Sequence, residues 1–508
     1  MMARYAMLLD THTCIGCLAC TVACKVEHGS PPGIWFAPVI EQEVGTYPDV
    51  WRLYLPLLCM HCDNPPCVRA CPSGAIARRP DGIVRIDAAR CCGSRACELA
   101  CPFGAIRFYA RPTYYYGLPT PFEKMKLARM QPGTAQKCDL CTSRIESGRR
   151  PACVDVCPTD SRIFGDLDDP HSEISLRLAG ELTVVLAGVS FAAPGVRYTT
   201  RGLRPSYPHR SSPTPVLPYR PQRIWGLSHA VEYLALGAGG GLHLASLLLR
   251  VDTRAWGLSL IRMLALALVV LGGLVLVAHL GRPHRFLLAL RNVRGSWLSR
   301  GALADFVLIA TMAVLSVPAG AAGVLPLATA LSASAALLVI TYPALAMGSY
   351  QAVPAWSGWR LPVEFLVDGL AAGTAVITLL GLQSTGTGAV ALLNLAEPGK
   401  PWPLALLMAF ALIRLVLLVH RTRALASADP GLAAAREGLE AGAGVFDRWG
   451  VRAAGIAGTL ILGSAALLTD GTAGAWLAAL TAFCTLTAAF SGKMVALRIG
   501  ARPAPESP

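Results

Sequence analysis

Cysteine spacing is the feature that most constrains this chain. Sixteen of its seventeen cysteines lie between Cys14 and Cys157, in four groups of four. The groups are Cys14, Cys17, Cys20 and Cys24; Cys59, Cys62, Cys67 and Cys71; Cys91, Cys92, Cys97 and Cys101; and Cys138, Cys141, Cys153 and Cys157. The first group has the spacing C-x2-C-x2-C-x3-C. Thiolates at such spacing hold iron–sulfur cubanes, with three ligands from one loop and the fourth from a distant group.

Two other uses of cysteine fit this pattern less well. A disulfide framework is typical of short secreted chains, and no secretory signal is visible at Met1–Leu8. Structural zinc would need two paired C-x2-C units for each site. Here each group instead has three cysteines followed by a fourth one. In three of the groups a proline follows the fourth cysteine, at Cys71-Pro72, Cys101-Pro102 and Cys157-Pro158. The pattern therefore predicts iron–sulfur clusters.

The 508 residues divide into three regions. Residues 1–180 are expected to form an α+β ferredoxin-type domain, with short strands at Tyr5–Leu9, Ile83–Ile86 and Ala105–Tyr109 between the cluster loops. Residues 181–225 are rich in proline and arginine and are expected to be an extended linker. Its arginines include Arg201, Arg204, Arg210, Arg220 and Arg223. Residues 226–508 are expected to form an all-α membrane domain.

Composition supports the membrane domain. The mean hydropathy is +0.48, and 54% of the residues are hydrophobic, which is high for a soluble protein. The net charge is +14, but the arginines lie in the linker and in short loops between apolar runs, so membrane topology explains them better than nucleic acid. Eight apolar runs approach the length of a membrane-spanning helix. They are Leu227–Leu249, Trp256–Leu280, Ala302–Ala322, Val324–Met347, Val363–Leu382, Leu404–Val419, Ala453–Leu468 and Ala475–Leu497.

Two parts of the chain resemble subunits of the dimethyl sulfoxide reductase family of molybdopterin enzymes. Residues 5–170 resemble the four-cluster ferredoxin subunit, through CIGCLACTVACKVEH, CMHCDNPPCVRACPSGA, RPDGIVRID, ACELACPFGAIRF and KCDLCTSRIESGRRPACVDVCP. The membrane half resembles the anchor subunit, through HLGRPHRFLLALRNVRGSWLSR and YQAVPAWSGWRLPVEFLVDGLAAG. The resemblance implies that two subunits, usually separate chains, are fused here into a bis-ferredoxin-like domain and a polytopic anchor.

The resemblance also implies the ligand sets, because the fourth cysteine of each group serves the cluster of a partner group. The implied sets are Cys14, Cys17, Cys20 with Cys157; Cys138, Cys141, Cys153 with Cys24; Cys59, Cys62, Cys67 with Cys101; and Cys91, Cys97 with Cys71. The last set lacks a ligand, since the family has a cysteine where this chain has Ser94. We expect three [4Fe-4S] clusters and, for the last set, a [3Fe-4S] cluster. The alternative is an altered [4Fe-4S] cluster ligated by Ser94 or Cys92.

Ionisable residues in the membrane half are candidates for a quinone site, because charge inside a bilayer is costly and usually functional. A quinone needs a hydrogen-bond donor and a proton acceptor near a cluster. The preferred pair is His279 with Asp305, and the reserve pair is His229 with Glu232. Glu364, Asp368, Arg414 and His420 lie towards the same side, and only His243 and Arg262 lie towards the other. Cys484 is expected to be a packing residue.

The resulting interpretation is an electron-transfer and quinone-reactive membrane subunit, whose substrate catalysis lies on a partner molybdopterin chain. Alternatives are the cluster and anchor subunit of a cytoplasm-facing sulfite dehydrogenase, a cluster-driven ion-translocating module, and a purely structural anchor. Thirteen arginines fall in loops and the tail on the side expected to face the ferredoxin domain, against three basic residues on the far side. The excess of basic residues predicts that this side is cytoplasmic, in a cytoplasmic (inner) membrane.

Overall fold

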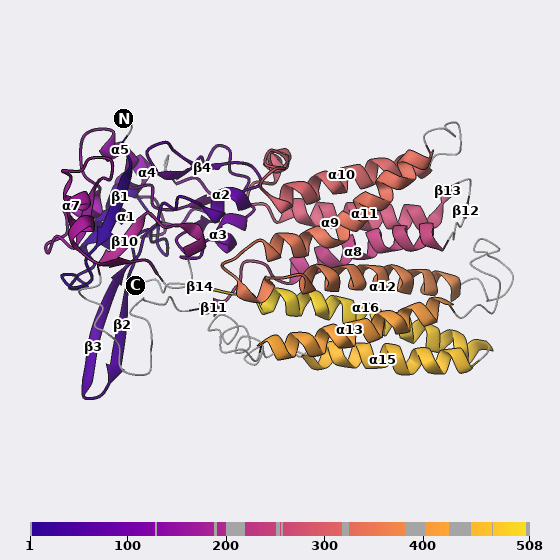
Figure 1. The fold of residues 1–508 in the computed structure, drawn as a ribbon. Helices are drawn as coiled ribbons and strands as arrows, with labels where there is room; N and C mark the ends of the chain where they lie inside the picture. Colours follow the sequence, from indigo (N-terminus) through magenta and orange to yellow (C-terminus); the bar gives the residue numbers. More distant parts are fainter. Residues whose placement is uncertain are drawn as a thin grey trace. The chain divides into compact units, whose positions relative to one another are not determined.

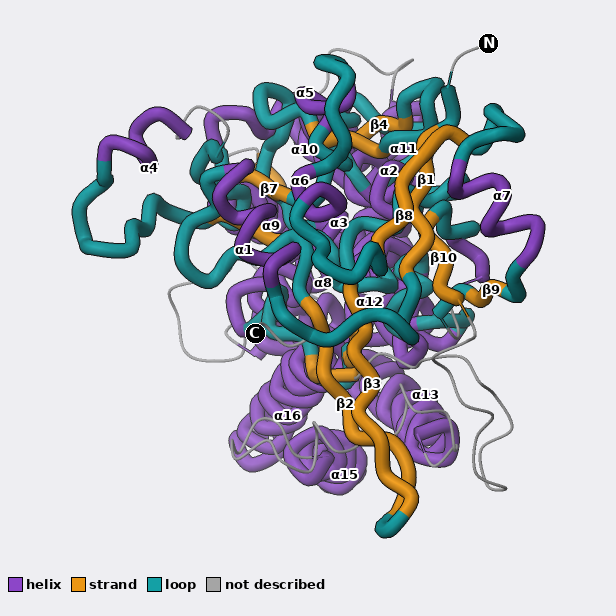
Figure 2. Tube along the Cα trace, turned by 90° about the vertical axis from the view of Figure 1, so that its left-hand side faces the viewer, coloured by secondary structure: helices purple, strands orange, loops and turns teal. Residues whose placement is uncertain are grey.

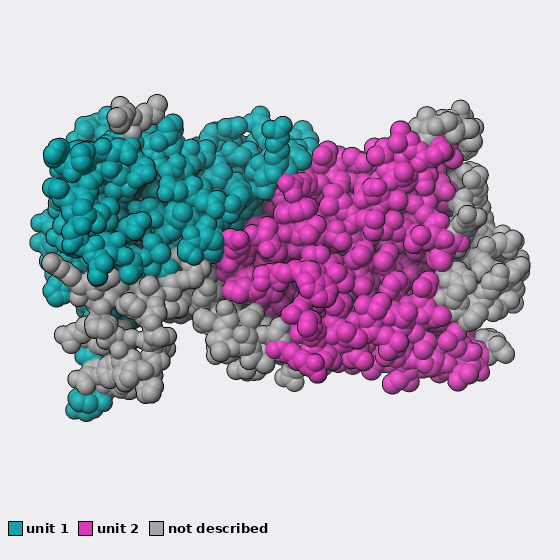
Figure 3. Space-filling view, viewed as in Figure 1, with its two compact units in different colours: residues 1–219, 280–295, 502–508 teal, residues 220–279, 296–501 magenta. Residues whose placement is uncertain are grey.

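The computed structural model divides the chain into two compact units (Figures 1 and 3). It describes residues 3–126, 130–186, 190–199, 219–249, 254–255, 258–316, 325–382, 402–425, 449–469 and 471–503. The first unit comprises residues 1–219, 280–295 and 502–508, and the second comprises residues 220–279 and 296–501. We call them the ferredoxin unit and the membrane unit.

The ferredoxin unit is built on a four-stranded sheet with the order β8-β1-β10-β9. Strand β1 has the sequence YAMLL, and its residues Ala6 to Leu9 are buried on both faces, as expected for a central strand. It pairs antiparallel with β8 and parallel with β10. The strands are β1 (Tyr5–Leu9), β8 (Arg162–Asp166), β9 (Thr183–Val184) and β10 (Val196–Thr199).

The sheet shows that the expected linker begins too early. Strands β9 and β10 lie within residues 181–225, yet β10 pairs with β1 in the register Met7 to Val196. The Thr199 hydroxyl also donates to Asp10 over 3.0 Å. The cluster pattern ends at Cys157 and gave no reason to extend the domain, whereas the sheet needs these strands to cover β1. Arg201, Arg204 and Arg210 lie outside the described residues.

The cluster loops of the ferredoxin unit are connected by short helices and hairpins. One hairpin, β2–β3, is long and extends away from the rest of the unit (Figures 1 and 2). The hairpins are β2–β3 (Val39–Thr46, Asp49–Pro56), β4–β5 (Ile76–Arg78, Val84–Ile86) and β6–β7 (Arg107–Tyr109, Thr134–Gln136). The helices are α1 (Ala19–His28), α2 (Pro66–Ala70), α3 (Ala96–Ala100), α4 (Pro121–Lys126), α5 (Thr142–Ile145), α6 (Ala152–Asp155) and α7 (Glu173–Gly180).

A segment from the membrane half of the sequence is part of the ferredoxin unit. It is Leu280–Gly295, which contains the 3-10 helix η3 (Pro283–Leu290). The Arg282 amide donates to the Cys92 carbonyl over 3.1 Å, and the Asn292 side chain donates to the Cys71 carbonyl over 2.8 Å. Gly281 approaches Gly93 and Gly133 so closely that a Cβ on any of these three glycines would clash with backbone. The segment therefore packs directly against the backbone of the third cysteine group.

Eight apolar helices form the membrane unit within the described residues (Figure 1). They are α8 (Leu227–Leu248), α9 (Leu260–Ala278), α10 (Trp297–Ser316), α11 (Leu325–Gly348), α12 (Arg360–Leu382), α13 (Trp402–Leu425), α15 (Trp449–Leu468) and α16 (Gly471–Arg498). Seven are long and apolar enough to cross a bilayer, and the apolar part of α15, Arg452–Leu468, is shorter. The expected all-helical membrane domain is confirmed.

Helices α8 and α12 approach each other through glycines. Gly237 and Gly241 lie four residues apart on α8, and Gly369 and Gly373 lie four apart on α12, so each pair occupies one helix face. A Cβ at Gly241 would overlap the Gly369 carbonyl, and a Cβ at Gly373 would overlap the backbone of Gly241. This is the small-residue spacing that allows helix backbones to come together in membranes. The contact joins the α8–α11 half of the unit to the half formed by α12, α13, α15 and α16.

Candidate functional site

The sixteen clustered cysteines are free thiols that gather in the ferredoxin unit from distant parts of the sequence. One set, Cys14, Cys17, Cys20 and Cys157, lines a single cavity. In a second set, burial raises the pKa of the Cys24 thiol well above its usual value, and the neighbouring thiols of Cys138, Cys153 and Cys141 raise it further. Four thiols that repel one another in this way fit a metal cluster, because coordination removes their protons.

Another implied ligand set also lines one cavity, together with the buried Lys137. It is Cys59, Cys62, Cys67 and Cys101. The Lys137 ammonium donates to the carbonyls of Val84 and Cys138. Burial alone would lower the pKa of Lys137, but Cys59 and Cys67 outweigh it and raise the pKa. A permanent cation next to this set would offset the negative charge of thiolates and sulfide.

The third cysteine group keeps the backbone of a cluster loop. Arg95 precedes α3 at φ +60°, as Leu18 precedes α1 at φ +61°, so Ser94 occupies the position that Cys17 occupies in the first loop. Cys97 has Cys71 and Cys91 as electrostatic neighbours. The Cys92 thiol is buried, and it has Cys91 and Cys71 among its neighbours. The geometry thus brings Cys71, Cys91 and Cys97 together and also keeps Cys92 within reach.

Two further basic side chains contact the cysteine sets, and sequence reasoning missed both. Arg162 is 3% exposed. Burial would lower the pKa of Arg162, but the thiols of Cys153 and Cys20 raise it above its usual value. His28 ends α1, and its Nε2 lies 3.4 Å from the Cys141 Sγ. The sequence places His28 four residues after Cys24, which could have suggested a role near a cluster. Nothing in the cysteine pattern predicts its contact with Cys141.

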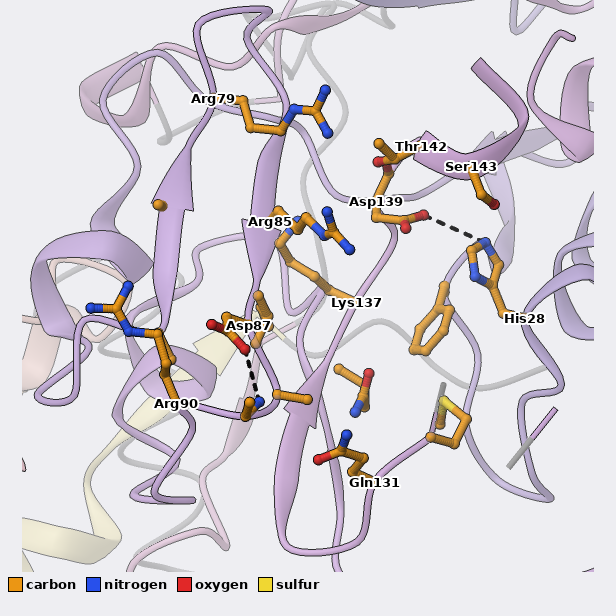
Figure 4. Close-up of a pocket in the computed structure, with 18 of the residues that line it drawn as sticks. His28, Arg79, Arg85, Asp87, Arg90, Gln131, Lys137, Asp139, Thr142 and Ser143 are labelled. Atoms are coloured by element: carbon orange, nitrogen blue, oxygen red, sulfur yellow. Dashed lines mark hydrogen bonds and ion pairs between the residues drawn. The ribbon is translucent and has the colours of Figure 1, made fainter. Parts of the chain in front are cut away.

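A large cavity of the ferredoxin unit lies beside His28 (Figure 4). Its volume is about 760 Å³. Basic and acidic side chains line it, and the Asp139 carboxylate lies 3.7 Å from the His28 ring. Its charged lining is Arg79, Arg85, Arg90, Lys137, Asp87, Asp139 and Glu146. Such a lining does not suit an apolar ligand such as a quinone, whose site would be mainly apolar.

In the membrane unit, three candidate residues meet at one end of helices α8 and α9. His279 Nδ1 lies 3.3 Å from the Glu232 carboxylate, which is 1% exposed. The His279 and His229 rings are stacked, with centroids 4.0 Å apart and planes 8° apart. Trp225 stacks on the other side of His229, and its ring centroid lies 5.6 Å away. The result is an aromatic stack that ends at a buried carboxylate–imidazole pair.

The same three side chains could be taken for a metal site, since their ligand atoms lie within 4.8 Å of one another. A metal ligand donates its lone pair in the plane of the imidazole ring. Nearly parallel planes at this separation do not converge on one ion, so the stacked arrangement of His229 and His279 disfavours a bound metal. It favours a site in which the imidazoles exchange protons or hydrogen bonds.

The pairing differs from the one expected. The structure pairs His279 with Glu232, and within the described residues Asp305 forms no ion pair with His279. Asp305 is 6% exposed and lies near Glu232, while its Oδ1 and the Tyr342 hydroxyl have no hydrogen-bond partner among the described residues. Tyr342 occupies the space left by Gly301, where a Cβ would overlap its ring. The hydrophobic pattern of each helix indicates how deep a residue lies in the membrane. It does not indicate which helices pack against each other, so it could not predict which side chains pair.

The remaining membrane candidates lie apart from this cluster. His243 is fully buried further along α8, and Arg262 donates to the Leu315 carbonyl over 2.5 Å. Cys484 on α16 packs against Gly458 of α15, where an added Cβ would lie 2.8 Å from its sulfur. Glu364, Asp368 and Arg414 form a separate ionic cluster in the other half of the unit.

Comparison with known proteins gives two family matches. Residues 50–114 and 118–167 match the 4Fe-4S dicluster domain family, and residues 216–462 match the family described as polysulphide reductase, NrfD. The two matched regions correspond to the two kinds of site described above.

Curated relatives match the ferredoxin part of the chain. A selenate reductase subunit of Mesobacillus selenatarsenatis is 36% identical over 214 residues, which are 39% of this chain and 72% of that protein. The arsenate respiratory reductase iron-sulfur subunit ArrB of Shewanella sp. (strain ANA-3) is 35% identical over 200 residues, 34% of this chain and 86% of that protein. A tetrathionate reductase subunit of Salmonella typhimurium is 43% identical over 178 residues, 34% of this chain and 63% of that protein.

These relatives are subunits of reductases, and one further relative is a putative dimethyl sulfoxide reductase iron-sulfur subunit of Halobacterium salinarum. It is 36% identical over 224 residues, 41% of this chain and 84% of that protein. The membrane unit adds an NrfD-type domain to the same polypeptide. The chain therefore belongs to the iron–sulfur subunits of the dimethyl sulfoxide reductase family, with an NrfD-type membrane domain fused to the ferredoxin domain in one polypeptide.

Proposed function

We propose that this protein relays electrons between a separate molybdopterin catalytic subunit and the membrane quinone pool, as in anaerobic respiration. The observation that carries the quinone part is the buried pair of His279 and Glu232, with His229 stacked on the imidazole. A quinone site needs a hydrogen-bond donor and a proton acceptor in an apolar setting, and this pair supplies both.

Oxidation of a quinol releases two electrons and two protons, and reduction of a quinone takes up the same number. The His279 ring can accept a quinol hydroxyl proton and pass one to the Glu232 carboxylate from Nδ1, which is the nitrogen that faces it. The reverse transfers serve quinone reduction. His229 would orient the quinone ring or its oxygen from the stacked position. When bound, the iron–sulfur clusters supply the one-electron carriers.

The ligand sets are part of the proposal. Cys14, Cys17, Cys20 and Cys157, then Cys24, Cys138, Cys141 and Cys153, then Cys59, Cys62, Cys67 and Cys101 would each hold a [4Fe-4S] cluster. Cys71, Cys91 and Cys97 would hold a [3Fe-4S] cluster, because Ser94 occupies the position of the missing ligand. The grouping of the thiols and the shared cavities support these sets.

The experiment is quinol exchange in the full complex with loaded clusters. We expect His279→Gln to abolish reduction of the clusters by a quinol analogue, while the iron content and the cluster spectra stay unchanged. His284→Gln is the matched control, because His284 is exposed and lies only five residues away. Normal quinol exchange in His279→Gln would refute this site. Co-purification of a molybdopterin subunit with the native chain tests the partner.

We also propose that the ferredoxin unit faces the cytoplasm. The basic residues of the loops and of the helix ends beside them support this, since the cytoplasmic side of a membrane protein carries the excess of lysine and arginine. They include Arg282, Arg285, Arg291, Arg294 and Arg300, with Arg360, Arg421, Arg423 and Arg452 on the same side. Arg436 and Arg448 on that side, and Arg250 and Lys400 on the other, lie outside the described residues. A reporter fusion that places the N-terminus outside the cell would overturn this orientation.

A second candidate has a specific observation behind it. A sulfite dehydrogenase subunit of Allochromatium vinosum is 35% identical over 199 residues, 35% of this chain and 75% of that protein. The chain could then deliver electrons from a sulfite-oxidising subunit to quinone, and the identity of the co-purifying catalytic subunit decides between the two.

An ion-translocating module is less well supported. Within the described membrane unit, the buried carboxylates Glu232, Asp305, Glu364 and Asp368 all lie in the first half of their helices. Their distribution therefore does not extend across the bilayer. Proton release across sealed vesicles during turnover would contradict this interpretation.

A further inference from the structure

The half of the membrane unit formed by α12, α13, α15 and α16 contains a second group of buried charges. Six ionisable side chains of α12, α13, α15 and α16 meet there, and each is at most 6% exposed. They are Glu364, Asp368, Arg414, Arg421, Arg452 and Lys493. We call them the ionic cluster. Among the described residues, four cations thus share two carboxylates, which is an excess of two positive charges.

The ion pairs show how the carboxylates are shared. The Glu364 Oε2 atom lies 3.1 Å from Arg421 Nη2 and 3.3 Å from Arg452 Nη1. The Asp368 carboxylate lies 2.8 Å from Arg414 Nε and 3.5 Å from Lys493 Nζ. Two guanidinium groups therefore crowd around one carboxylate oxygen, although like charges at this distance repel each other.

Hydrogen-bonding capacity is left over on the same side chains. Among the described residues, Arg421 Nη1, Arg452 Nε and Lys493 Nζ have no hydrogen-bond partner, and neither does Glu364 Oε1. Lys493 Nζ instead lies 3.4 Å from the centroid of the Phe365 ring. Gly492 leaves the room for this arrangement, since a Cβ there would lie 2.9 Å from Asp368 Oδ2 and 3.3 Å from the Arg452 guanidinium.

Uncompensated buried charge costs several kcal/mol per ion, so an excess of cations calls for another anion. Arginine binds oxyanions through paired N–H donors, and phosphate offers matching acceptors. The position within the helices fits such a ligand. Glu364, Arg421 and Arg452 lie within one or two turns of a helix end, at the depth where the hydrocarbon of a bilayer meets its headgroups.

We infer that the ionic cluster binds one phosphate-class oxyanion, held by Arg421 and Arg452 on the side away from Glu364 Oε2. The anion is either inorganic phosphate or the phosphate of a lipid headgroup. Its bound charge neutralises the excess and ties α12, α13 and α15 together. This site lies outside the proposed quinone site, so it does not depend on that assignment.

The test uses the full chain with loaded clusters, purified in phosphate-free buffer and stripped of lipid. Inorganic phosphate is titrated in one arm, and phosphatidylglycerol is added in the other. Sodium chloride at equal ionic strength is the control, and the readouts are the thermal unfolding midpoint and the bound phosphorus by native mass spectrometry. We expect a saturable rise in the midpoint and one phosphorus-containing adduct per chain. The arm that produces them identifies the source.

A pair of variants on α13 locates the site. Arg421→Gln should weaken phosphate binding roughly tenfold or more, because it removes a charge-assisted hydrogen bond. Arg423→Gln should leave binding unchanged, because Arg423 is exposed two residues further on. If the wild-type midpoint responds to neither phosphate nor phosphatidylglycerol, the proposal is wrong, and this result needs no variant to fold. Equal adducts in both variants would also overturn it.

Discussion

The His279 Nδ1 atom lies 3.3 Å from the Glu232 carboxylate, at the end of α9 and near the start of α8. The two residues are 47 positions apart in the sequence, and the antiparallel packing of the two helices brings them together. Because Glu232 is 1% exposed, its contact with the imidazole replaces contact with water.

Replacing the carboxylate by its amide should block proton transfer without removing the hydrogen bond. We expect Glu232→Gln to slow quinol oxidation roughly 100-fold, a value typical of a lost general base. Asp305→Asn should have a smaller effect, since the described residues show no ion pair between Asp305 and His279. Stopped-flow reduction of the clusters by a quinol analogue measures both rates. A larger loss in Asp305→Asn than in Glu232→Gln would restore the pair expected from the sequence.

The third cysteine group should hold three iron atoms. The protein is then expected to contain about fifteen iron atoms per chain, against about sixteen for four cubanes. The oxidised protein should show the low-temperature resonance of a three-iron centre, and Ser94→Cys should remove it, because the new thiol would occupy the position that Cys17 occupies in the first loop. Cys92→Ser is the companion variant. If fully loaded wild-type protein lacks the resonance and Cys92→Ser creates it, Cys92 is a ligand.

His28 should raise the reduction potential of the cluster proposed for Cys24, Cys138, Cys141 and Cys153. In the tautomer that carries its proton on Nε2, the His28 ring donates to the Cys141 Sγ and stabilises the reduced, more negative cluster. Loss of a hydrogen bond worth about 1.4 kcal/mol lowers a one-electron potential by roughly 60 mV. We expect His28→Leu to shift one cluster by this order in a potentiometric titration. His171→Leu, at an exposed histidine of the same unit, should shift none. Unchanged potentials in His28→Leu would show that the contact has no electronic effect.

The glycines between α8 and α12 should be intolerant of even one methyl group. Gly241→Ala places a Cβ on the Gly369 carbonyl, and overpacking of this kind costs about 1–3 kcal/mol. Gly273→Ala on α9 is the matched control, since nothing lies within 4 Å of its Cβ position. Alanine is also the better helix former, so the control should be neutral or slightly stabilising. Thermal unfolding in detergent compares the two variants, and equal midpoints would contradict the close approach.

The sequence predicted the elements whose chemistry is local. Tyr5–Leu9 forms the expected strand, and the apolar runs form the expected helices, because strand burial and bilayer thickness act on contiguous residues. It did not predict contacts between distant residues. Strand β10 lies in a stretch whose arginine and proline content predicts a linker rather than a strand. Lys137 is buried, although no pattern in its sequence neighbourhood predicts this. Which side chains pair in the membrane half depends on the rotation of each helix about its own axis. The sequences of α10 and α11 do not predict this rotation, because these helices are only weakly amphipathic.

The packing of Leu280–Gly295 against the third cysteine group has a consequence for biosynthesis. A ribosome finishes Cys157 long before it reaches Asn292, whose side chain donates to the Cys71 carbonyl. The ferredoxin unit therefore remains incomplete until α8 and α9, which precede this segment, have been synthesised. The backbone carbonyls of Cys92 and Gly93 gain their partners, the amides of Arg282 and Gly281, only at that moment. In this fused chain, completion of the fold around the third cysteine group is therefore tied to synthesis of the first two membrane helices.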